Sequence, residues 1–387
     1  MDPLKLNEYQ LLAKDTDRIS TDVDGLRTLL LGLFGEAGSL LSSLKKSKRD
    51  GNDFPNFQAV QEEELGDCLW YLTAICRRLE IGLEEVALDV IKNSFDSKVS
   101  RLPAPLSFRD FQAIATAAAV LTQTTIEADL FALGSTAGQF LEIAKDGNPT
   151  VEKLKGPLSD MLAAIAKAAA VKDIPLNQVA LNNLQKNSSR WPTEKIYREP
   201  FDSIFDENEQ LPRQIEIEFI EKNVAGKTYV LQRCKGINIG DRLTDNKIQN
   251  DDYRFHDVFH LAYAVHLGWS PVMRALFKVK RKSDPKVDEV QDGARAILIE
   301  EGISTVVFTR ALGLGLFEQT HPDYDLLKLV QEFVKGFEVD QCPMWQWNEA
   351  ITDGFRVFRD LKRERKGVVK ADLINHTLTF ELIAGRS

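Results

Sequence analysis

An internal repeat constrains the fold of this 387-residue chain more than any other feature of its sequence. The segment 81–88 (IGLEEVAL) recurs as 174–181 (IPLNQVAL), and the same offset relates Asp67 to Asp160. Each copy closes on an Arg-x-Pro triplet, at 101–103 and at 190–192. A repeat of this kind predicts two related structural units, followed by a third part with a different pattern.

Both copies have the apolar spacing of α-helices. In the first copy, Leu65, Leu69, Leu72 and Ile75 recur at helical intervals, and runs of β-branched residues are few. We therefore predict two all-α bundles, one over residues 1–104 and a shorter one over 106–192, joined at the Pro-Ala-Pro breaker 103–105.

The pattern changes after Pro192. Residues 212–234 alternate between polar and apolar around an Ala225-Gly226 turn, which predicts a β-hairpin. Helical spacing returns from about 252 to 365, and 373–380 has the pattern of a strand. The predicted fold is mainly α: two helical bundles, then an α+β domain over 200–387 with a small antiparallel sheet.

Charge and composition exclude several classes of function. The chain has 49 Lys and Arg against 58 Asp and Glu, a net charge of −9, so we expect no extended nucleic-acid partner. No apolar run approaches the ~20 residues that span a membrane, and the chain does not start like a signal peptide. The four cysteines form no CxxC pair, which argues against a disulfide framework or a structural zinc site. We expect a cytoplasmic protein.

Three acids of the first copy are candidate metal ligands. Glu36 follows an apolar run within one predicted helix, and Glu64 and Asp67 lie one helical turn apart on another, so they point the same way. On facing helices these acids would converge, which is costly unless a cation neutralises them, and oxygen ligands suit Mg²⁺ or Mn²⁺. The alternative is that residues 62–64 form a solvated acidic face near a helix start.

Further motifs of the first copy have a specific order and spacing. They are Tyr9-Gln10 with Ala13 and Thr16, the segment 35–38 (GEAG), the segment 63–72 (EELGDCLWYL), and a tail from Asn93 to the RLP triplet at 101–103. Together they resemble the MazG-like, all-α nucleoside triphosphate pyrophosphohydrolases over about a hundred residues.

The resemblance implies an activity and a set of site residues. It implies that Glu36, Glu64 and Asp67 are catalytic metal ligands for Mg²⁺, and that one carboxylate orients a water that splits a nucleoside triphosphate into monophosphate and pyrophosphate. One family position differs, because the second Glu of the first acidic motif is Ser39 here, a weaker and neutral ligand. This change puts the metal count and the activity in question.

The second copy has lost most of the acidic pattern. Thr136 and Pro157 stand where the family has glutamates, so this copy cannot hold metals in the family manner. Its tail keeps Lys186 and Arg190 at the spacing that the family uses near the nucleotide.

The two copies therefore predict a composite site. We hypothesise an intramolecular pseudo-dimer in which the first copy supplies carboxylates and the second supplies nucleotide-binding Lys186 and Arg190, with Lys98 and Arg101 of the first tail as further candidates. The alternative is that the second copy is only a packing partner, and a homo-oligomer is also open.

The third unit carries a separate cluster of possible metal ligands. His256 and His260 lie at i and i+4, and a later helical pattern presents acids on one face, with Glu301 adjacent. The acids are Glu289, Asp292 and Glu300. This set could bind Zn²⁺, Mn²⁺ or Fe²⁺, or could be a hydrogen-bonded structural network. A zinc-protease interpretation of the His-Asp-x-x-His pattern lacks a third ligand at a familiar distance. The unit resembles a C-terminal extension of some MazG-like proteins, which implies no activity.

Two functions follow from the sequence. The first is a Mg²⁺-dependent nucleoside triphosphate pyrophosphohydrolase. The second is a nucleotide-sensing or regulatory protein with an impaired first site, in which any chemistry resides at His256, His260 and Glu300.

Overall fold

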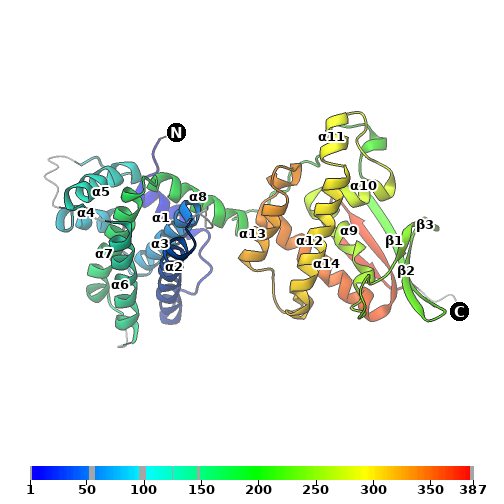
Figure 1. Ribbon diagram of the computed structural model, residues 1–387, viewed down its shortest axis with the longest axis horizontal. Helices are drawn as coiled ribbons and strands as arrows, with labels where there is room; N and C mark the ends of the chain where they lie inside the picture. The colour runs from blue at the N-terminus through cyan, green and yellow to red at the C-terminus, as the bar shows by residue number, and fades with distance from the viewer. Residues whose placement is uncertain (1, 52–56, 96–101, 124, 146–148, 384–387) are drawn as a thin grey trace. The chain divides into compact units, whose positions relative to one another are not determined.

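A computed structural model describes residues 2–51, 57–95, 102–123, 125–145 and 149–383 of the chain. The chain divides into two compact units, Met1–Thr193 and Glu194–Ser387, which are described separately here (Figure 1). The fold is mainly helical with one small antiparallel sheet in the C-terminal unit, which confirms the predicted fold class.

The N-terminal unit is all-helical in the part that the structure describes. Its helices are α1 (Leu6–Lys14), α2 (Val23–Asp50), α3 (Phe57–Arg78), α4 (Leu83–Asn93), α5 (Phe108–Thr122), α6 (Ile126–Lys145), α7 (Val151–Val171) and α8 (Leu176–Arg190). Their buried apolar residues form one continuous core.

Helix α2 shows how the sequence produces these elements. The Asp22 carboxylate caps its first turn by accepting a hydrogen bond from the Gly25 amide at 2.8 Å. Leu26, Leu29 and Leu33 then recur at helical spacing and are buried. The helix therefore turns an apolar stripe toward α3 and α6.

The helix pairing places α8 against α3. Helix α3 packs on α2 and α8, and α7 packs on α6 and α4. The last helix of each half thus contacts the third helix of the other half. Gly66 lies at the contact of α3 with α8, where a Cβ would be 3.2 Å from the Asn183 Cβ. The missing side chain allows α8 to approach α3 closely beside Asp67.

The C-terminal unit combines helices with one sheet. Its strands are β1 (Gln214–Val224), β2 (Lys227–Cys234), β3 (Ile237–Leu243), β4 (Lys366–Asp372) and β5 (Thr377–Glu381). Its α-helices are α9 (Asp257–Leu267), α10 (Pro271–Phe277), α11 (Pro285–Val290), α12 (Ala294–Leu312), α13 (Tyr324–Phe333) and α14 (Met344–Glu364). Short 3₁₀ turns are η2 (Glu207–Glu209), η3 (Tyr253–Phe255), η4 (Gly315–Phe317) and η5 (Glu338–Gln341).

The strands form an antiparallel sheet in the order β3-β2-β1-β4-β5. The predicted hairpin is present: β1 and β2 pair from Val224 and Lys227 outward, and Ala225 and Gly226 both have positive φ, as a tight hairpin turn requires. Helices α9 and α14 pack on each other and on β4 and β5.

The predicted strand over 373–380 is wrong in its first half. Residues 373–376 form the turn between β4 and β5, where His376 has a φ of 51°, and only the segment from Thr377 is extended. The preceding strand β4 was not predicted. It follows α14 directly, and two of its three buried positions, Gly367 and Ala371, carry small residues that give a weak strand signal.

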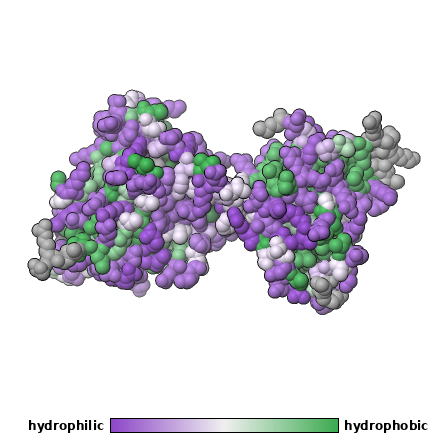
Figure 2. Space-filling view, turned by 180° about the vertical axis from the view of Figure 1, so that it is seen from behind, coloured by the Kyte–Doolittle hydropathy of each residue, from purple (hydrophilic) through white to green (hydrophobic). Residues whose placement is uncertain are grey.

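Polar residues cover most of the face seen in Figure 2, and apolar residues appear there in separate patches. Among the described residues, no helix is both long and apolar enough to cross a membrane.

Candidate functional site

Three carboxylates meet where α2 faces α3. Glu36 comes from α2, and Glu64 and Asp67 come from α3. One oxygen from each of these side chains lies within 4.8 Å of the others. The neighbouring Ala37 and Leu65 are buried in the core, so the apolar stripes of the two helices direct the acids toward one another.

The cluster holds more acid than its surroundings neutralise. Glu36 and Glu64 lie close enough to interact through their carboxyl groups, and a hydrogen bond between them would require a proton on one of the two. Burial raises the pKa of Glu64 to about 8, aided by the hydrogen bond and by the charges of Glu36 and Asp67. Burial also raises the pKa of Glu36, and the charge of Asp67 adds to the increase, although the hydrogen bond with Glu64 opposes it.

Helix α8 brings a cation and an amide to this cluster. The Lys186 ammonium lies 2.5 Å from Asp67 Oδ2 and 3.2 Å from Glu63 Oε1. The Asn183 amide donates to Asp67 Oδ1 at 3.0 Å, and the Tyr9 hydroxyl donates to Asn183 Oδ1 at 2.9 Å. Both halves of the N-terminal unit therefore contribute to one polar site.

Lys186 is charged in this setting. Burial lowers the pKa of its ammonium, but the carboxylates of Asp67 and Glu63 outweigh burial and raise the pKa above its usual value. The positive charge from α8 offsets part of the negative charge from α3. The sequence analysis identified Lys186 but missed Tyr9 and Asn183 as site residues. Asn183 is the first residue of the Asn-x-x-Lys pattern that identified Lys186, so this pattern could have indicated it.

Of the other N-terminal candidates, Arg190 and Ser39 lie within the described residues. Arg190 ends α8, and its guanidinium carbon is 4.8 Å from the centre of the Trp191 ring. Lys98 and Arg101 lie outside the described residues. Ser39 is half-buried, one turn after Glu36 on α2.

The equivalent place in the second half lacks the acids. Asp160 is exposed on α7, and Thr136 donates its hydroxyl to the Ala132 carbonyl of its own helix at 2.9 Å. Pro157 lies within α7, one turn before Asp160.

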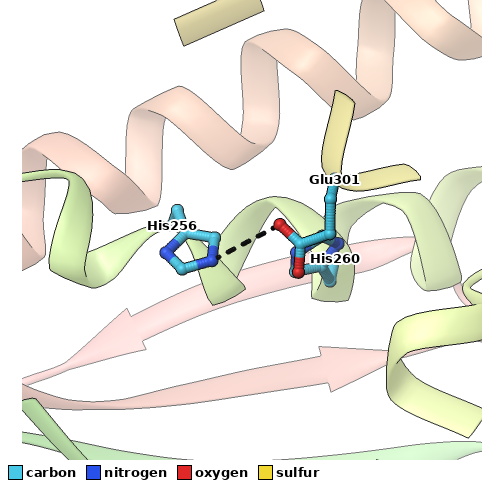
Figure 3. Close-up of side chains that lie close together, drawn as sticks. All are labelled: His256, His260 and Glu301. Atoms are coloured by element: carbon cyan, nitrogen blue, oxygen red, sulfur yellow. Dashed lines mark ion pairs between the residues drawn. The ribbon is translucent and has the colours of Figure 1, made fainter. Parts of the chain in front are cut away.

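The C-terminal unit brings two of its predicted ligands together. His256 and His260 lie at the start of α9 with Glu301 of α12 facing them (Figure 3). One ligand atom from each of the three lies within 4.8 Å of the others. Glu301, which the sequence marked only as a neighbour of Glu300, is the acid that faces the pair.

The remaining predicted ligands are engaged elsewhere. Glu300 accepts hydrogen bonds on the far side of the His260 ring, at Nδ1. Asp292 pairs with Arg281 at 2.6 Å, and Glu289 is exposed. The prediction that Glu289, Asp292 and Glu300 share one helix face is wrong. Helix α11 ends at Val290 and α12 begins at Ala294, so helical spacing does not continue between them.

Comparison with known proteins adds a family relationship. Residues 196–384 match the sequence model of the MazG C-terminal domain. A stretch of 86 residues is 33% identical to the "Gene 37 protein" of Mycobacterium phage L5, and this alignment covers 20% of the present chain and 75% of the phage protein. No solved structure matches the chain.

Proposed function

Because the chain belongs to a MazG-related family, we propose that it hydrolyses a nucleoside triphosphate to a nucleoside monophosphate and pyrophosphate. The observation that carries the proposal is the convergence of Glu36, Glu64 and Asp67 from two helices onto one place in the N-terminal unit. Ribonucleoside and deoxyribonucleoside triphosphates both contain the group that such a site recognises.

The carboxylates fit a hard divalent cation. Burial and the neighbouring acids raise the pKa of Glu64 to about 8, so a bound cation would replace the proton that this carboxyl group otherwise holds. Oxygen ligands favour Mg²⁺, with Mn²⁺ as a substitute. Bound Mg²⁺ would neutralise phosphate charge and lower the pKa of water near the reacting phosphorus. Glu36, Glu64 and Asp67 would hold it, and one of these carboxylates would orient the attacking water.

Lys186 supports a composite site formed by the two repeats. Its ammonium reaches across from α8 to Asp67 and Glu63, so the second repeat supplies charge to the acids of the first. A lysine beside a metal cluster is suited to bind triphosphate oxygens as a point charge. We therefore propose that the second repeat takes part in nucleotide binding as an internal dimer partner, with Arg190 as a secondary contact.

Ser39 reduces the number of acidic ligands on α2 to Glu36. Glu63 does not replace the missing acid, since its carboxylate pairs with Lys186 and is not one of the three that converge. We propose that fewer cations bind here than at a site with both glutamates. The alternative function, nucleotide sensing without turnover, would follow if this reduced set binds nucleotide but does not activate water.

The test is pyrophosphate release by the full chain from a panel of NTPs and dNTPs with Mg²⁺ or Mn²⁺. We expect turnover in the wild type and its loss in Asp67→Asn. The matched control is Asp160→Asn, the same substitution at the repeat-equivalent and exposed position, which should retain activity. If the wild type releases no pyrophosphate but still binds a non-hydrolysable triphosphate, the result would favour nucleotide sensing over hydrolysis. Equal activity of the two variants would reject the site.

A further inference from the structure

The C-terminal unit contains a second set of ligand atoms whose arrangement the proposed hydrolase does not use. It consists of His256 and His260 at the start of α9 and Glu301 on α12 (Figure 3). His260 is fully buried and His256 is nearly so, whereas the Glu301 side chain is 39% exposed. The set is therefore a buried histidine pair that opens to solvent beside one carboxylate.

Both imidazole rings are held so that Nε2 faces the shared space. His256 Nδ1 lies 2.9 Å from the Tyr253 carbonyl oxygen, which can only accept, so Nδ1 carries the proton. His260 Nδ1 lies 2.8 Å from Glu300 Oε1. When Nδ1 is the donor, a neutral imidazole presents the lone pair of Nε2, and this is how metal-binding histidines are oriented in proteins.

Glu300 is fixed as the acceptor of the His260 proton. Its carboxylate also accepts the Ser270 hydroxyl at 2.6 Å and the Val272 amide at 2.8 Å. With three hydrogen-bond partners around it, the Glu300 carboxyl group holds the ring and is not free to bind a cation itself. The acid predicted from sequence as a ligand is thus the residue that orients one.

The open side of the His260 ring has no hydrogen bond. Nε2 of this ring is buried and has no hydrogen bond of good geometry among the described residues, although it forms an ion pair with Glu301. It lies 3.5 Å from Glu301 Oε1, and His256 Nε2 lies 3.7 Å from Glu301 Oε2. Two atoms bound to one tetrahedral ion at about 2.0–2.1 Å are about 3.3 Å apart, so a small movement of the exposed Glu301 would complete the site.

The chemistry of these atoms selects the ion. Two imidazole nitrogens and one carboxylate oxygen suit Zn²⁺ and its neighbours in the first transition series, and do not suit Mg²⁺. Three protein ligands leave one position for water, which is the arrangement of catalytic rather than structural zinc sites. Asp257 lies beside this position: its Oδ1 is 3.2 Å from His256 Nε2, and its Oδ2 accepts from the Gln232 amide at 2.5 Å.

We propose that His256, His260 and Glu301 bind a divalent transition-metal ion of the Zn²⁺ type, with a fourth position open to water and Asp257 next to it. The site is independent of the carboxylate cluster in the N-terminal unit. The competing interpretation is a metal-free imidazolium ion pair. Burial lowers the pKa of His260, but the charges of Glu300 and Glu301 outweigh burial and raise it well above its usual value.

The test is Zn²⁺ binding by the full chain, measured by competition with a chromophoric chelator, followed by the visible spectrum of the Co²⁺ form. Glu301→Gln removes one ligand and keeps size and polarity at a partly exposed position, so the fold should persist, as circular dichroism will check. Glu289→Gln is the matched control, because Glu289 is an exposed glutamate of the same unit away from the set. Repeating the titration in Glu64→Gln identifies any ion held by the N-terminal acids.

We expect the wild type to bind one Zn²⁺ that Glu289→Gln and Glu64→Gln retain. Glu301→Gln should lose more than about tenfold in affinity, since loss of a direct ligand should cost at least as much as loss of a supporting residue. The Co²⁺ form should show the intense visible absorption of a low-coordinate nitrogen-ligated site, and Glu301→Gln should weaken it. Equal Zn²⁺ affinity in Glu301→Gln and Glu289→Gln, or no binding by the wild type, would overturn the proposal in favour of the ion pair.

Discussion

Replacing Glu64 by glutamine should stabilise the metal-free protein while it abolishes Mg²⁺ binding at the N-terminal carboxylate cluster. Glutamine has the shape of a protonated glutamic acid, so Glu64→Gln removes the charge that the cluster disfavours and keeps a hydrogen-bonding group beside Glu36. A structural glutamate would show the opposite, because its replacement would cost stability. The sign of the stability change therefore distinguishes a Glu64 that binds a cation from a Glu64 that stabilises the fold through hydrogen bonds.

The magnitude follows from the pKa of Glu64, which rises from a usual 4.5 to about 8 in the folded protein. Each tenfold change in proton affinity corresponds to about 1.4 kcal/mol, giving a gross cost of about 5 kcal/mol above pH 8. Glu64 is only half-buried and water screens its charge, so we discount this figure to about 2 kcal/mol. For a unit of this size, 2 kcal/mol corresponds to a Tm increase of about 4–8 °C.

The dependence on pH has a definite sign. A carboxyl group whose folded pKa is raised weakens the folded state as pH rises, so the wild type should lose stability between pH 4.5 and about 8, and Glu64→Gln should not. The two proteins should be similar below pH 4.5 and differ most above pH 8. With Mg²⁺ present the wild type should become the more stable of the two proteins. An ion at a hundred times its Kd adds about 2.7 kcal/mol to the free energy of unfolding of the protein that binds it.

The assay is calorimetric unfolding of the full chain in chelator and in Mg²⁺, at pH 5 and at pH 8.5. The N-terminal transition is recognised as the one that Mg²⁺ shifts in the wild type. Glu62→Gln, a neighbouring substitution on α3 outside the carboxylate cluster, is the control and should change little. A metal-free Glu64→Gln protein that is less stable than the wild type at pH 8.5 would refute the reasoning.

Three further predictions concern other parts of the N-terminal unit. Lys186→Met should weaken triphosphate binding by about tenfold or more, because a charged hydrogen bond is worth about 1.5–3 kcal/mol, and unchanged affinity in calorimetric titration would remove the composite site. Gly32→Ala should cost about 2 kcal/mol, because its Cβ would lie 2.2 Å from the Tyr71 ring, whereas Gly35→Ala, with nothing within 4 Å, should not destabilise; denaturant unfolding checks both. Burial raises the pKa of Asp17, but hydrogen bonds from Arg77 and Arg78 outweigh burial and lower it, so the contribution of Asp17 to stability should vanish as pH falls below about 4. Asp17→Asn should lower the free energy of unfolding at pH 7 by on the order of 3 kcal/mol and make stability less dependent on acid pH. The same dependence of stability on acid pH in the variant and the wild type would contradict this.

The sequence predicted the parts of the structure that follow from local periodicity. Apolar spacing predicted that residues 1–192 are helical, and the Ala225-Gly226 turn located the hairpin. The acids Glu64 and Asp67 lie one turn apart on a regular helix, so their common direction followed from helical geometry alone.

The remaining features of the two sites could not be predicted, because they depend on where helices end and on packing between segments that are distant in the sequence. Gly293 separates α11 from α12 and ends the spacing that had grouped Glu289 with Glu300. Adjacent glutamates on a helix point about 100° apart, and only packing against α9 and α10 decides that Glu300 is buried beside the His260 Nδ1 while Glu301 faces Nε2. Tyr9 reaches the site through Asn183, far along the chain, which no local pattern reveals.

The most direct test of the central claim is the product analysis of one reaction. The full chain is incubated with Mg²⁺ and a nucleoside triphosphate that it turns over, and the products of wild type and Glu64→Gln are separated by ion-exchange chromatography. We expect equal amounts of nucleoside monophosphate and pyrophosphate from the wild type and none from the variant. Release of orthophosphate with nucleoside diphosphate, or the same products from both proteins, would contradict it.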